Sequence, residues 1–103
     1  MIKVIWTGRA LSDLEDIRDY IAKDSDKYAR LTIEKLINTA RLIENHPLAG
    51  RIVPEINIEE IREIISGNYR IIYHYQPKSH VYILTVHHGS GLLSNNPFLD
   101  KTK

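Results

Sequence analysis

Cysteine is absent from this chain of 103 residues, and its absence excludes several structures and chemistries. No disulfide can staple the fold, and no thiol is available as a nucleophile or as a ligand for zinc or an iron–sulfur cluster. The chain also has only five glycines and four prolines, too few for a collagen-like or low-complexity protein. The fold must therefore rest on the packing of apolar side chains.

Long hydrophobic runs and an excess of charge of one sign are also missing. No window approaches the roughly 18 apolar residues that a bilayer-spanning helix needs. The first residues, Met1 to Trp6, turn polar at Thr7, before they reach the roughly 7 to 15 apolar residues of a signal peptide. We therefore expect a cytoplasmic protein with no membrane partner. The net charge of +1 provides no overall attraction to nucleic acid.

What is present is the composition of one globular domain, with 43% hydrophobic and 26% charged residues. The charges are arranged in blocks. Residues 9–26 hold three basic and six acidic side chains, whereas residues 27–51 hold five basic and two acidic ones. Such blocks are typical of solvated faces, but they also permit a local basic surface.

The first half of the chain predicts a short strand followed by two helices. Residues 3–6 are apolar and β-branched and precede Thr7-Gly8, as expected of a strand. Two apolar stripes with helical spacing follow, and Pro47 ends the second near Asn45. The stripes consist of Leu11, Leu14, Ile17 and Ile21, and of Ala29, Ile33, Leu36, Ile37, Ala40 and Ile43. This half is therefore predicted to be a strand and a helical hairpin.

The second half predicts three strands. After an irregular connection marked by Gly50, Pro54 and Asn57, strands are expected at residues 61–65, 69–76 and 80–88, with turns at 66–68 and 77–79. Turns this short require antiparallel pairing. The predicted fold class is α+β: an N-terminal strand, a helical hairpin, then a three-stranded antiparallel meander. We expect a single domain over residues 1–93 and a loosely ordered tail over residues 94–103.

The turn at residues 77–79 also predicts which residues of the last two strands face each other. A three-residue loop pairs His74 with Tyr82, Ile72 with Leu84 and Arg70 with Val86. Arg70 and His88 would then share a face as diagonal neighbours, about 7 to 8 Å apart at the backbone, a placement suited to binding a phosphate and moving a proton. A two-residue loop would bring His87 to that face instead. The structural alternative is an arginine paired with Glu55 or Glu63 at the sheet surface.

The five histidines do not predict a metal site. His87 and His88 are neighbours on a strand, so their rings point to opposite faces and cannot both bind one ion without a bulge. His46, His74 and His80 lie elsewhere in the chain. Gly89-Ser90-Gly91 resembles an anion-binding nest, but a flexible strand exit explains it better. We expect neither a metal nor a cofactor.

Five segments, taken in order and with their spacing, resemble the RelE/ParE superfamily of bacterial toxins. The resemblance covers about Met1 to Leu93. The segments are LEDIRDYI at 14–21, PLAGRIVPE at 47–55, IREI at 61–64, YRIIY at 69–73 and VHHG at 86–89. It implies the toxin of a type II toxin–antitoxin (plasmid stabilisation) system. Such a toxin is neutralised by a cognate antitoxin that wraps over it, in a toxin–antitoxin hetero-oligomer.

The resemblance implies one of two activities, which divide the superfamily. RelE-like members cut messenger RNA on the ribosome without a metal, and ParE-like members inhibit DNA gyrase. Glu55, Arg70 and His88 lie where some RNA-cutting relatives carry a carboxylate base, a phosphate-binding arginine and a histidine acid. However, Ser90-Gly91 stands where many members have an arginine pair, and Gly89 where a cleaving branch has a tyrosine.

The ParE-like activity is therefore favoured, and it requires no catalytic residues. Contacts with nucleic acid or another target are then expected from Arg51, Arg62, Arg70 and His87. The alternatives are a ribosome-dependent mRNA endonuclease, and a toxin-derived module that has lost its activity and only binds an antitoxin. The missing arginines motivate the last of these.

Overall fold

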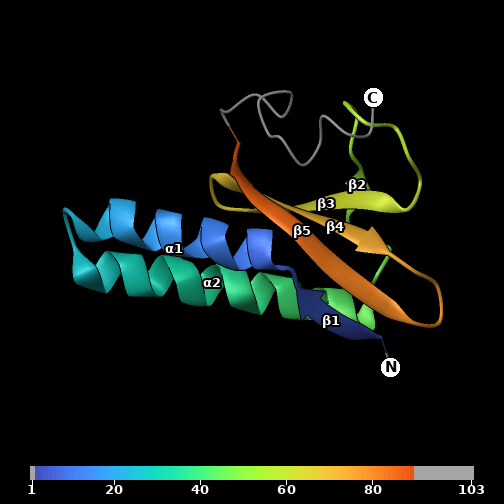
Figure 1. Ribbon diagram of the computed structural model, residues 1–103, viewed down its shortest axis with the longest axis horizontal. Coiled ribbons are helices and arrows are strands. Elements are labelled where there is room, and N and C mark those ends of the chain that lie inside the picture. Colours follow the sequence, from blue (N-terminus) through green and yellow to red (C-terminus); the bar gives the residue numbers. More distant parts are fainter. Residues whose placement is uncertain (1, 90–103) are drawn as a thin grey trace.

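A five-stranded sheet and a pair of helices form the two layers of the computed structural model (Figure 1). The structure describes residues 2–89. The strands lie in the order β1-β5-β4-β3-β2. Neighbours are antiparallel except β1 and β5, which are parallel. Their bounds are β1 Lys3–Trp6, β2 Arg51–Ile52, β3 Ile61–Ser66, β4 Tyr69–Tyr75 and β5 His80–His88.

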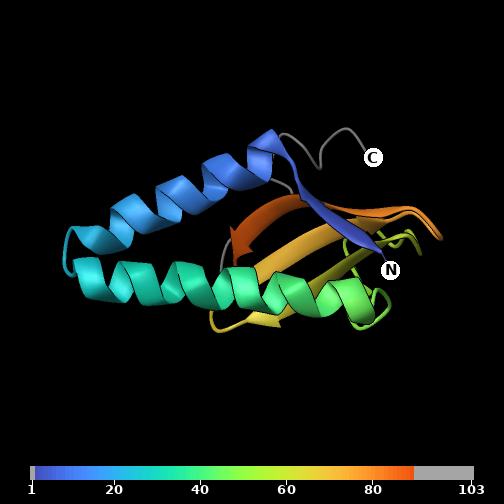
Figure 2. The ribbon, with the colours of Figure 1, turned by 90° about the horizontal axis from the view of Figure 1, so that it is seen from below.

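Helices α1 (Gly8–Ala22) and α2 (Asp26–Asn45) form the predicted hairpin. Each begins at a hydroxyl cap, because the side chain of Thr7 accepts from the Ala10 amide and that of Ser25 from the Tyr28 amide. The closed end of the hairpin projects beyond the strands, while its open end lies beside the sheet (Figure 2). Part of the surface of both helices is thus not covered by the sheet.

The main core lies between the helices and one face of the sheet. Its buried residues come from both helices and from the strands β4 and β5: Ala10, Leu14, Leu36, Ala40, Ile43, Ile71, Tyr73, Val81, Ile83 and Val86. Burial of each large apolar side chain contributes about 1.5–3 kcal/mol. A smaller cluster of Val53, Ile72 and Leu84 lies on the opposite face of the sheet, with Ile56 packed against it. The connection between β2 and β3 therefore covers only part of that second face.

The free edge of β5 beyond β1 is occupied by side chains of α1 and its cap. The Thr7 hydroxyl donates to the Ile83 carbonyl at 2.7 Å. Asp13 then accepts from the Val86 amide at 3.0 Å and from the Thr85 hydroxyl. A strand edge left open is a template for unwanted pairing. Asp13 thus binds the edge of β5 at the residues that β1 is too short to reach.

The predicted α+β fold class is confirmed, with two differences. Arg51–Ile52 forms the short edge strand β2 within what was predicted to be an irregular connection. The second difference is the register of β4 and β5. His74 pairs with Tyr82 as predicted, but a bulge next to Tyr73 adds one residue to β5 and shifts every later pair.

The bulge makes two predicted pairs wrong. Ile72 faces Thr85 instead of Leu84, and Arg70 faces His87 instead of Val86.

Neither helix of the described residues is long and apolar enough to cross a membrane. The predicted tail at 94–103 lies outside the described residues, as do Ser90 and Gly91.

Candidate functional site

The face of the sheet opposite the helices, here called the open face, carries a row of four side chains of alternating charge. Arg70 of β4 donates through Nε to Glu63 of β3 at 2.5 Å. Its Nη1 and Nη2 donate to the two carboxylate oxygens of Glu55 at 2.9 and 3.0 Å. Glu63 in turn accepts from Nε of Arg51 at 2.6 Å. Two arginines and two glutamates therefore neutralise each other in one connected cluster, here called the ion network.

Strand pairing explains why these four residues meet. Arg51 lies directly opposite Glu63 in the β2–β3 pair. Glu63 faces Ile72 of β4, so Arg70, two residues earlier, is its diagonal neighbour on the same face. Glu55 arrives from the connection that follows β2. The short strand β2 thus places Arg51, and the connection that follows it places Glu55.

Exposure differs sharply along the ion network. The side chain of Glu63 is 0% exposed and that of Arg70 is 10% exposed, whereas those of Glu55 and Arg51 are 47% and 65% exposed. A buried carboxylate is tolerated only when its charge is paired and its oxygens are hydrogen-bonded, and both conditions hold for Glu63. Glu63 therefore anchors the buried side of Arg70, and Glu55 covers its solvent side.

The same contacts shift the protonation equilibria of the pair. The Arg70 hydrogen bonds hold the pKa of the Glu55 carboxyl below its ordinary value, although partial burial opposes this. The bonds to Glu55, and then those to Glu63, raise the pKa of Arg70 further above its already high value. Both groups stay charged at neutral pH, and Glu55 is a weaker base than a free glutamate.

The two adjacent histidines lie on opposite faces of the sheet. His87 is directly across from Arg70, and its Nε2 is buried without a hydrogen-bond partner among residues 2–89. His88 instead packs edge-on against Tyr69, with ring centroids 5.4 Å apart. The prediction that Arg70 and His88 share a face is therefore wrong, because the bulge in β5 moves His87 into that place.

The remaining predicted residues are divided between the ion network and its support. Glu55, Arg70 and Arg51 come together, and the alternative pairing of Arg70 with Glu55 or Glu63 is found with both. Arg62 instead supports the chain on both sides of β2, donating to the carbonyl of Gly50 before it at 3.0 Å and to that of Glu59 after it at 3.1 Å. Sequence reasoning named Glu63 only as a surface partner. Its complete burial follows from strand pairing that no local pattern reveals.

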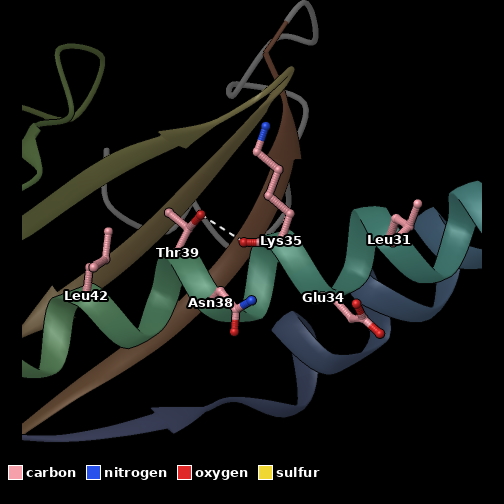
Figure 3. Close-up of a pocket in the computed structure, with 6 residues that line it drawn as sticks. All are labelled: Leu31, Glu34, Lys35, Asn38, Thr39 and Leu42. Atoms are coloured by element: carbon pink, nitrogen blue, oxygen red, sulfur yellow. Dashed lines mark hydrogen bonds between the residues drawn. The ribbon is translucent and has the colours of Figure 1, made fainter.

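The outer face of α2 offers a second kind of surface, shallow and partly apolar (Figure 3). Leu31 and Leu42 lie at its two ends and are 47% and 54% exposed. The polar residues between them are Glu34, Lys35, Asn38 and Thr39. Thr39 binds back to the Lys35 carbonyl at 2.8 Å. Because these polar residues separate the two leucines, this face is not one continuous apolar patch of the kind that marks a protein-binding surface.

Residues that could hold a metal ion are not gathered anywhere in the described chain. Within residues 2–89, no three histidine, aspartate or glutamate side chains lie close enough to share an ion. The chemistry that the open face offers is therefore that of its charges: a guanidinium clamped between two carboxylates, with an imidazole beside it.

The model of a protein family described as the ParE toxin of the type II toxin–antitoxin system parDE matches residues 4–93. The chain therefore belongs to this family of toxins. Toxin RelE2 of Caulobacter vibrioides is 32% identical over 92 residues, covering 89% of this chain and 100% of that protein. The family model is thus named for one branch of the superfamily and this relative for the other.

Two known structures share the fold. A chain of the chromosomal ParDE system from P. aeruginosa superimposes with a TM-score of 0.71 and 18% identity, covering 85% of this chain and 96% of that one. A chain of the toxin–antitoxin complex RelBE2 from Mycobacterium tuberculosis has a TM-score of 0.62 and 21% identity, covering 84% and 96% respectively. At these identities the likeness concerns the fold alone.

Proposed function

We propose that this protein is a growth-inhibiting toxin that acts by binding DNA gyrase and that a cognate antitoxin neutralises it. Its membership of the ParE toxin family supports the toxin role. The ion network supports the choice of gyrase over messenger RNA, because the groups expected to cut RNA are engaged with each other or lie apart.

The observation that carries this choice is that the guanidinium of Arg70 is already bound by two carboxylates, those of Glu55 and Glu63. Metal-free RNA cleavage needs a base for the 2′-hydroxyl, a cation for the phosphate and an acid for the leaving oxygen. Here the candidate base, Glu55, has a lowered pKa and fills both Nη positions of the candidate cation. The candidate acid, His88, lies on the other face beside Tyr69. An inhibitor that works by binding needs none of these groups free.

A pair of assays with one protein preparation tests the proposal. We expect the purified toxin to stop supercoiling of relaxed plasmid by gyrase, with half-inhibition near the gyrase concentration. Messenger RNA on translating ribosomes should stay intact in primer extension. Codon-specific cuts, with supercoiling untouched, would contradict the proposal.

One observation favours the runner-up, a ribosome-dependent mRNA endonuclease. His87 faces Arg70, and its buried Nε2 has no partner within residues 2–89, so an imidazole acid and a guanidinium are adjacent. If the protein is such an endonuclease, a phosphate of the RNA replaces the carboxylate of Glu55 at the guanidinium of Arg70. Cleavage that disappears in His87→Asn, but persists in His88→Asn, would establish it.

The antitoxin role is supported by the apolar surface that the fold leaves exposed. The residues concerned are Leu11, Tyr20, Tyr28, Leu31, Leu42, Leu48, Ile58 and Ile65. The two structural relatives come from systems described as toxin–antitoxin pairs. We expect the product of the adjacent gene to co-purify with this chain. Induction of the chain alone should arrest growth, whereas an inactive antitoxin-binding module would leave growth unchanged.

A further inference from the structure

A small pocket lies on the helix-covered side of the sheet, away from the ion network. Asp16, Ile17 and Tyr20 of α1 form one wall, and Tyr69 of β4 and His88 of β5 form the other. Toward its closed end the hairpin to which α1 belongs runs past the ends of the strands (Figure 2). The pocket therefore opens beside helix surface that no strand covers.

The walls are aromatic, and the rings are accessible. Tyr20 is 72% exposed, and Tyr69 is half-buried with His88 against it in an edge-on contact. Burial raises the pKa of the Tyr69 phenol, with smaller contributions from the nearby Tyr28 and Tyr20. Tyrosine faces attract cations, and Lys23 already places its Nζ 5.7 Å from the centre of the Tyr20 ring.

The pocket also contains a carboxylate that has no cation of its own. Along α1, Asp13 pairs with Arg9 at 3.2 Å and Asp19 pairs with Arg18 at 3.2 Å. Asp16 lies between them, lines the pocket, and has no ion-pair partner among residues 2–89. An unpaired carboxylate beside aromatic faces is complementary to a positive, partly apolar side chain.

The charge around the pocket decides between classes of partner. Of the five residues that line the pocket, Asp16 alone carries a fixed charge, and it is negative, so a phosphate placed beside it would be repelled. A basic protein segment would be attracted. Arginine fits better than lysine, because its planar guanidinium stacks on a ring and can donate two parallel hydrogen bonds to one carboxylate.

We propose that this pocket binds an arginine side chain of a partner protein, with the guanidinium against the rings of Tyr20 and Tyr69 and bonded to the carboxylate of Asp16. Ile17 contacts the apolar stem of that side chain. This inference goes beyond the proposed function, and it holds whether the toxin acts on gyrase or on ribosomes.

A peptide titration of the purified full chain tests this site. The probe is a capped pentapeptide with a central arginine between leucine and alanine residues, followed by amide shifts in two-dimensional NMR at a pH above the histidine range. We expect saturable shifts at Ile17, Tyr20 and Tyr69. The matching peptide with citrulline, which keeps the shape and lacks the charge, should bind roughly three- to tenfold more weakly.

Two variants and one control locate the interaction. Asp16→Asn should reduce binding of the arginine peptide to the level of the citrulline peptide, and Tyr20→Ala should weaken binding of both peptides. Glu15→Gln is the matched control, because Glu15 lies on the same helix outside the pocket and should bind like the natural chain. Unchanged thermal midpoints would show that the fold is intact.

Two outcomes would overturn the inference. One is equal binding of the arginine and citrulline peptides. The other is saturable binding of a uridine tetranucleotide at the same amides, unaffected by Asp16→Asn, which would assign the pocket to nucleic acid. Neither outcome bears on gyrase inhibition, which the supercoiling assay measures separately.

Discussion

Replacing Glu63 by glutamine keeps the size of the side chain and removes the buried negative charge that Arg51 and Arg70 share. The carboxylate of Glu63 is 0% exposed and accepts from both arginines. A hydrogen bond to a charged group contributes about 1.5–3 kcal/mol to stability. Glutamine can keep one bond as a neutral acceptor, but its amide group then points N–H donors at the other guanidinium.

The expected loss of stability is therefore about 2–4 kcal/mol, since one bond is lost and the Arg70 charge loses its buried partner. Small domains unfold with about 5–15 kcal/mol, so the change is a large fraction of the total. In urea, the unfolding midpoint should fall by on the order of 1 to 2 M. Circular dichroism at equilibrium, with the fitted slope compared between variants, provides the measurement.

Glu55→Gln is the matched comparison, because it removes the other carboxylate bound to Arg70. Glu55 is 47% exposed, and water screens and replaces its contribution, so its loss should cost no more than about 1 kcal/mol. Glu59→Gln, on the same connection and outside the ion network, should cost nearly nothing. If Glu63→Gln lowers the midpoint no further than Glu55→Gln does, burial does not control the strength of this network and the reasoning is refuted.

Three further outcomes are expected. Tyr73→Phe should cost about 1–3 kcal/mol in urea unfolding, because the hydroxyl that donates to the Pro47 carbonyl at 2.8 Å and accepts from the Gly50 amide at 2.9 Å is lost. The Glu55–Arg70 contribution should be full above the ordinary glutamate pKa of 4.5 and fade as the pH falls through the lowered folded-state value; a pH series on Glu55→Gln should lack that part of the decline. Finally, Glu55→Gln should arrest growth as strongly as the natural toxin in an induction assay, and a loss of arrest at an unchanged midpoint would instead favour RNA cleavage.

The sequence by itself determined the local elements of this protein. Both helices follow from apolar stripes with helical spacing, and the end of the second also follows from Pro47. The strands at β1, β3, β4 and β5 follow from β-branched and aromatic runs between turn residues. These signals act between residues close in the chain, so they can be read without knowing the fold. The order of elements then sufficed for the α+β class, and the five segments in their order carried the family resemblance.

The tertiary structure alone decided how the strands align and which charges are buried. A single extra residue in β5 moved His87 opposite Arg70 and placed His88 beside Tyr69. Neither glycine nor proline lies near residue 84 to signal that bulge in the sequence. In the same way, Glu63 reads as an ordinary surface glutamate within β3. It becomes a buried anchor only because Arg51 and Arg70 reach it from two other strands, and the free energy of a buried charge depends on such distant partners.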